Sequence, residues 1–99
     1  MFKIVEKRKL AENIYQMKIA AERVARAALP GQFVIVRATE NGERIPLTIA
    51  DYDTEAGTVT IVTQTIGMST RKICALNEGD SLVDFAGPLG RPSEFVHMP

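Results

Sequence analysis

The segment Arg44-Ile45-Pro46-Leu47-Thr48 brings a cation, a proline and a hydroxyl close together on one β-prone stretch. A guanidinium suits a phosphate, because its fork of N–H donors matches the phosphate oxygens. A threonine hydroxyl both donates and accepts, so it can pair with an aromatic ring nitrogen in either protonation state. The same residues also fit a surface arginine, a proline at an edge or bulge and an ordinary strand threonine, and this plainer interpretation is the commoner one.

A second candidate site is Thr65-Ile66-Gly67-Met68-Ser69-Thr70. A strand is expected to end at Gly67, and a helix to begin with Ser69 or Thr70 as its N-cap. Unpaired N–H groups at such a corner suit an anion, and a glycine lets the backbone approach a phosphate closely. A capped helix without a ligand explains the two hydroxyls equally well.

The elements that must position these residues are short strands separated by turns. Tyr15, Met17 and Ile19 alternate with polar residues, as in a half-buried strand. Pro46 cannot donate to a ladder, so its strand should have an edge, a bulge or a ligand there. The pattern predicts an all-β fold, a six-stranded antiparallel barrel with one or two short inserted helices. Strands are expected at 2–9, 13–19, 32–38, 44–50, 58–65 and 81–85, and helices at 20–29 and 70–76.

Composition limits the possible functions. The chain has 99 residues, which suits one domain, and a formal net charge of zero, which disfavours non-specific nucleic-acid binding. The single cysteine, Cys74, is expected in the core and cannot form an internal disulfide or a cysteine-based metal site. Asp51 and Asp53 flank a tyrosine, and such a pair is more often solvated than metal-binding. No apolar stretch is long enough to span a membrane and no signal peptide is evident, so we expect a cytoplasmic chain. We also expect no metal-ligating residues.

Taken in order, four segments resemble the FAD-binding half of the ferredoxin–NADP reductase superfamily. The resemblance is greatest to the electron-transfer subunits of dihydroorotate dehydrogenase B and the alpha subunits of NADH-dependent ferredoxin:NADP oxidoreductase, also called sulfide dehydrogenase subunits. The segments are Pro30-Gly31-Gln32-Phe33-Val34, Arg44-Ile45-Pro46-Leu47-Thr48-Ile49-Ala50-Asp51, Gly67-Met68-Ser69-Thr70 and Gly87-Pro88-Leu89-Gly90.

The resemblance implies a six-stranded Greek-key barrel that holds FAD. Thr48 would approach the flavin N5 edge, Leu47 and Pro46 would pack on the isoalloxazine, and Arg44 would reach the pyrophosphate. The implied phosphate corner is Gly67, Met68, Ser69 and Thr70. Arg44 lies four residues before Thr48 rather than the usual three, and Leu47 replaces an aromatic residue. A one-residue change in this spacing places the arginine side chain on the opposite face of the strand, unless a β-bulge restores it. Pro46 is the expected position of such a bulge.

The resemblance implies that residues 1–90 form the FAD-binding barrel and that the parent protein has further domains. The segment 87–90 would turn the chain out of the last strand, and 91–99 would form an interdomain elbow or tail. A pyridine-nucleotide domain and a [2Fe–2S] domain would follow, electrons would pass between a nicotinamide and the iron–sulfur centre, and the parent complex would include a catalytic partner subunit. No catalytic residue is implied in this chain, and by itself it should not oxidise NAD(P)H.

Two alternatives to this flavin domain remain open. One is a cofactor-free barrel that binds protein or RNA, although the neutral charge and six aromatic residues do not favour RNA. The other is a subunit-contact domain whose apolar face forms a homodimer when other domains are missing.

Overall fold

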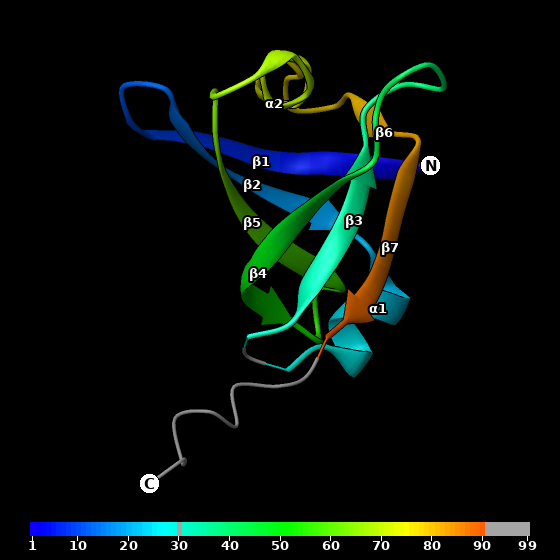
Figure 1. Cartoon of the computed structure of the whole chain (residues 1–99). Helices are drawn as coiled ribbons and strands as arrows, with labels where there is room; N and C mark the ends of the chain where they lie inside the picture. The colour runs from blue at the N-terminus through cyan, green and yellow to red at the C-terminus, as the bar shows by residue number, and fades with distance from the viewer. Residues whose placement is uncertain (30, 91–99) are drawn as a thin grey trace, which may run out of the picture.

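The computed structural model describes residues 1–29 and 31–90 and forms a nearly closed antiparallel barrel (Figure 1). The seven strands lie in the order β6-β1-β2-β5-β4-β3-β7. Because β6 and β7 follow each other in the chain, the two ends of the sheet come together. The elements are β1 (Phe2–Ala11), β2 (Ile14–Ala20), α1 (Glu22–Ala27), β3 (Phe33–Arg37), β4 (Ile45–Asp53), β5 (Thr58–Gln64), α2 (Met68–Cys74), β6 (Ser81–Leu82) and β7 (Asp84–Leu89).

The predicted all-β barrel with two short helices is confirmed, with one more strand than expected. The expected last strand is two strands, because Ser81 and Leu82 pair with β1 whereas 84–89 pair with β3. The expected turn at 87–90 is wrong for its first three residues. Leu89 still pairs with Phe33, so β7 continues past Gly87. The predicted elbow or tail at 91–99 lies outside the described residues.

The core is built from the inward positions of alternating strands. Met17 and Ile19 from β2, Val34 from β3, and Val59 and Ile61 from β5 are all fully buried. Each such side chain stabilises the fold by about 1.5–3 kcal/mol through removal of apolar surface from water. The helix expected at 20–29 is present in shortened form as α1, which packs against β4, β5 and β7 and closes one end of the barrel.

Helix α2 lies at the other end of the barrel, above β5 in Figure 1. It begins at Met68 with Gly67 as N-cap, so the expectation of Ser69 or Thr70 as N-cap is wrong. Its far end is tied to β1, because Lys7 Nζ donates to the Cys74 carbonyl at 2.5 Å. Neither helix in the described ranges is long and apolar enough to cross a membrane.

Candidate functional site

The two segments with candidate chemistry lie on either side of a place where neighbouring strands separate. The first half of β4, residues 45–48, pairs only with β3, and pairing with β5 begins at Ile49 opposite Ile61. Beyond Ile61, β5 pairs only with β2. The two strands therefore diverge toward the end of the barrel that carries α2 (Figure 1). We call the region between residues 45–48 and residues 62–69 the β4–β5 opening.

Pro46 occupies a strand position that needs no N–H. The Ile49 N–H donates to the Gln32 carbonyl at 2.9 Å, and Thr48 is opposite Phe33. Hydrogen-bonded pairs alternate along an antiparallel ladder, so Pro46 falls at a non-hydrogen-bonded position. The expected edge at Pro46 is confirmed. The bulge proposed there is wrong, because the irregularity in β4 lies after Ile49, on the side of β5.

The predicted flavin-contact residues of β4 lie on two faces. Pro46 and Thr48 are exposed and share the outward face, as the alternation of side chains requires. Leu47 faces the other way and packs, partly buried, against the core. A ligand in the opening can therefore meet the Thr48 hydroxyl and the Pro46 ring together, whereas Leu47 supports this stretch of β4 from behind.

Arg44 is directed away from the second segment. Its Nη2 lies 3.2 Å from Asp84 Oδ2, and the same oxygen is 2.8 Å from Arg37 Nε. Asp84 opens β7, which lies beyond β3 and thus on the side of β4 opposite to β5. The structure does not bring Arg44 together with Gly67–Thr70. The Arg44 side chain is mostly exposed, so its ion pair with Asp84 contributes little to stability.

The connection from β5 to α2 offers open backbone at Gly67. Its φ of −161° is extended, which any residue adopts, so glycine is not needed for the local conformation. A Cβ placed there would meet nothing within 4 Å. The N–H groups of Met68 and Ser69 belong to the first turn of α2 and have no intrahelical acceptor. No partner of the Ser69 hydroxyl exists among the described residues, so it too can meet a ligand.

Thr70, by contrast, has its hydroxyl committed to the corner itself. The Oγ1 accepts from the N–H groups of Ile66 at 3.0 Å and Gly67 at 2.9 Å, and it donates to the Gly67 carbonyl at 3.0 Å. These three bonds fix the corner's shape. Thr70 therefore positions the backbone donors, and the hydroxyl available to a ligand is that of Ser69.

Sequence reasoning missed two apolar residues on this side of the opening. Val62 is 36% exposed, because it lies between the buried Ile61 and Thr63 and therefore faces outward. Ile66 is 80% exposed and follows the last residue of β5, Gln64. This side of the opening thus combines uncovered backbone at Gly67, N–H groups without an intrahelical acceptor and exposed apolar side chains.

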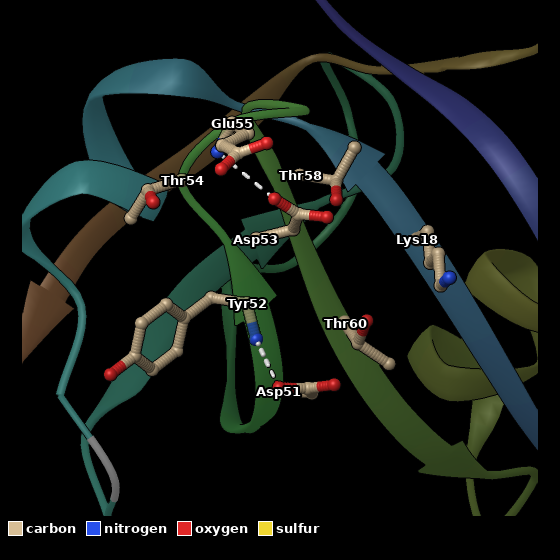
Figure 2. Close-up of a pocket in the computed structure, with 8 residues that line it drawn as sticks. All are labelled: Lys18, Asp51, Tyr52, Asp53, Thr54, Glu55, Thr58 and Thr60. Atoms are coloured by element: carbon tan, nitrogen blue, oxygen red, sulfur yellow. Dashed lines mark hydrogen bonds between the residues drawn. The ribbon is translucent and has the colours of Figure 1, made fainter.

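A separate hollow of about 450 Å³ lies on the outer face of β2, β5 and β4 (Figure 2). Asp53 Oδ1 accepts from the N–H groups of Glu55 and Ala56, and Asp51 Oδ1 accepts from the Tyr52 N–H. Both aspartates are exposed to solvent. In residues 1–29 and 31–90, no group of three or more His, Cys, Asp or Glu is arranged to hold a metal ion.

Cys74 lies in the core as predicted, with 4% of its surface exposed. Burial raises the pKa of its thiol above the ordinary value, and the nearby Lys7 ammonium opposes this only in part. The thiol therefore stays protonated near neutral pH and is a packing group, not a nucleophile.

Comparison with known proteins identifies relatives that are about three times as long as this chain. No family model matches. A Clostridium beijerinckii protein, described as an uncharacterized protein in the adh 3′ region, is 62% identical over 97 residues, which cover 98% of this chain and 33% of that protein. The dihydroorotate dehydrogenase B (NAD(+)) electron transfer subunit homolog of Thermotoga maritima is 45% identical over 91 residues, 92% of this chain and 32% of its own length.

Solved structures agree with these sequence matches. The NADH-dependent reduced ferredoxin-NADP oxidoreductase superposes with a TM-score of 0.92 at 44% identity, over 95% of this chain and 34% of that one. An Amycolatopsis cytochrome P450 reductase has a TM-score of 0.72 at 19% identity, over 91% and 28%, and supports the fold alone. The resemblance to the electron-transfer subunits of dihydroorotate dehydrogenase B and to the ferredoxin–NADP oxidoreductase is confirmed. The chain spans about a third of the length of these relatives.

Proposed function

We propose that residues 1–90 form an FAD-binding domain of a flavin-dependent electron-transfer protein. The observation that carries the proposal is the β4–β5 opening, which has the two candidate segments on its two sides in a chain similar to flavin-based electron-transfer proteins. The supporting relatives are an electron transfer subunit and a protein of flavin-based electron bifurcation. Bound flavin would accept a hydride and release electrons singly.

In this proposal the chain binds and orients the cofactor. The Thr48 hydroxyl would pair with the ring nitrogen at N5, in either protonation state, because it both donates and accepts. Pro46 would cover part of the ring, and Leu47 would hold that stretch of β4 against the core. The Ser69 hydroxyl and the backbone donors of 68–69 would meet the phosphates above Gly67. Arg44 contributes only if its pair with Asp84 opens.

The remainder of the electron path is proposed for the whole protein. Sites for NAD(P)H and for a [2Fe–2S] cluster would lie outside residues 1–90, and a catalytic partner subunit would complete the path. The described chain alone is therefore expected not to oxidise NAD(P)H. The cytoplasm is the proposed location, because the sequence has a single cysteine. No specific observation favours the alternative of a cofactor-free binding module.

Thr48→Val tests the proposed flavin contact. One hydrogen bond contributes about 0.5–1.5 kcal/mol, so FAD affinity should fall by a factor of about two to twelve, or the flavin potential should shift. Thr58→Val is the matched control, because Thr58 is another strand hydroxyl on the outer face of the sheet but lies outside the opening. Unchanged FAD affinity and unchanged potential in Thr48→Val would refute the role of Thr48.

A further inference from the structure

The hollow on the outer face of β2, β5 and β4 is lined by more acidic than basic residues (Figure 2). Its acidic lining residues are Asp51, Asp53 and Glu55. In residues 1–29 and 31–90, none of these three carboxylates forms an ion pair. The basic lining residue, Lys18, pairs instead with Glu6 at 3.9 Å. The hollow therefore carries a net negative charge.

An irregularity in β4 turns both aspartates toward the hollow. Ile49 is buried opposite the inward-facing Ile61, so in a regular strand the side chain of Asp51 would face the core as well. The register shift after Ile49 places one extra residue in β4, and Asp51 lies opposite Thr60 instead. A β-bulge of this kind re-aims the side chains that follow it. Asp53, two residues further along the strand, therefore faces the hollow too.

The floor of the hollow holds a hydroxyl with no hydrogen-bond partner among the described residues. Thr60 lies between Lys18 on β2 and Asp51 on β4 in the strand register, and only 5% of its surface is exposed. It lines the hollow, and Figure 2 shows no hydrogen bond from its hydroxyl to the other lining residues. A buried hydroxyl without a partner costs free energy, so a ligand that donates to it would be favoured here.

A guanidinium group fits these features better than a metal ion. Two successive outward positions on a strand are about 6.6 Å apart, whereas a metal ion lies within about 2.6 Å of each ligand oxygen. One oxygen of Asp51 and one of Asp53 already accept from backbone N–H groups. A planar guanidinium has five N–H donors that point to different sides, so it can donate to both carboxylates and to the Thr60 hydroxyl.

We propose that the hollow binds an arginine side chain of a partner polypeptide. The guanidinium donates to the second oxygens of Asp51 and Asp53 and to the hydroxyl of Thr60. Arginine is enriched at protein interfaces, which favours a polypeptide as its source. Only this source rests on the proposed function, which includes a partner subunit. The hollow itself is separate from the flavin site, because its lining on β4 begins at Asp51 and the β4–β5 opening ends at residue 48.

A titration of the 99-residue chain with N-acetyl-arginine methylamide, without flavin, tests this proposal. Nuclear magnetic resonance of the backbone amides gives the Kd, and N-acetyl-citrulline methylamide is the uncharged ligand of the same shape. The arginine compound should shift amides within residues 51–60 and bind at least about fivefold more tightly than the citrulline compound. Asp51→Asn and Asp53→Asn should each weaken its binding about two- to fivefold, as expected for loss of one exposed ion pair. Glu40→Gln removes an exposed carboxylate outside the hollow and should leave the Kd unchanged.

Thr60→Val separates a ligand contact from a structural role. Valine has nearly the same shape, and the Thr60 hydroxyl has no partner in the described fold, so stability in a urea titration should be unchanged or higher. The same variant should bind N-acetyl-arginine methylamide about two- to twelvefold more weakly. Lower stability with an unchanged Kd would overturn the role of Thr60.

The remaining outcomes distinguish this proposal from other occupants and from the proposed function. Equal binding of the arginine and citrulline compounds would overturn it, because the carboxylates would then not recognise the charge. Amide shifts as large around Glu40 as around Asp51 would overturn it too, since they would indicate non-specific attraction to acidic surface. Tighter binding of calcium ion than of the arginine compound would assign the hollow to a metal. None of these results changes the flavin proposal, whereas failure of the chain to bind FAD would remove only the assigned source of the arginine.

Discussion

Replacing Gly67 with alanine should weaken flavin binding while leaving the chain nearly as stable as before. Gly67 is extended and has open space above its Cα, so a methyl group meets no protein atom within 4 Å. Alanine is a poorer N-cap than glycine, but it also restricts the unfolded chain. These two effects oppose each other, and the free energy of unfolding should change by no more than about 1 kcal/mol.

The same methyl group should obstruct a ligand that lies over Gly67. It projects about 1.5 Å from the Cα, which is enough to lengthen the hydrogen bonds between a phosphate and the neighbouring N–H groups. Hydrogen bonds to a charged group contribute about 1.5–3 kcal/mol each. Loss of one such bond corresponds to a fall in FAD affinity on the order of 10- to 100-fold.

Urea denaturation without flavin and fluorescence titration with FAD measure the two effects separately. Gly57→Ala provides the contrast, because Gly57 has a φ of +70° in the turn between β4 and β5, at the end away from α2. That variant should lose stability and keep its FAD affinity. Gly67→Ala should do the reverse. A Gly67→Ala chain with unchanged FAD affinity would refute the placement of the phosphates at this corner.

Two further predictions concern the barrel itself. The buried Gln32 side-chain amide accepts from the Leu29 N–H and donates to the Gly90 carbonyl. Gln32→Leu should therefore lower the free energy of unfolding, measured by urea titration, by about 2–4 kcal/mol. A Gln32→Leu chain with wild-type stability would contradict this prediction. Because burial raises the pKa of Cys74, its contribution to stability is fully present below the ordinary value of 9.0 and is lost as pH rises above it. Between pH ~7.5 and pH ~10, the free energy of unfolding should therefore fall more for the wild-type chain than for Cys74→Ala. Equal falls in the two chains would contradict a raised pKa of the Cys74 thiol.

Much of the barrel is predictable from local pattern. Alternation in residues such as Met17 and Ile19 marks the inward face, and Pro46 signals a strand edge without any structure. The division of the last strand is not predictable this way. Leu82 and Phe85 both read as buried strand residues, and only their pairing with β1 and β3, distant in sequence, separates them.

The candidate site was predictable in its segments but not in its details. Motif order located Thr48 and Gly67, which are on either side of the same opening. The roles within each segment depend on tertiary contacts: Thr70 turned out to bind its own corner, and Arg44 to pair with Asp84. The exposure of Ile66 was not predictable, because an apolar residue that follows a strand can equally turn into the core, and only the tertiary structure shows that it is 80% exposed.

The most direct test of the central claim is the visible absorption spectrum of the chain after incubation with excess FAD and removal of free flavin. A retained flavin band with perturbed vibronic structure is the predicted result, and it would show that the barrel holds the cofactor with its own residues. A colourless chain that also stays colourless when extended past residue 99 would contradict the claim that this is a flavin domain.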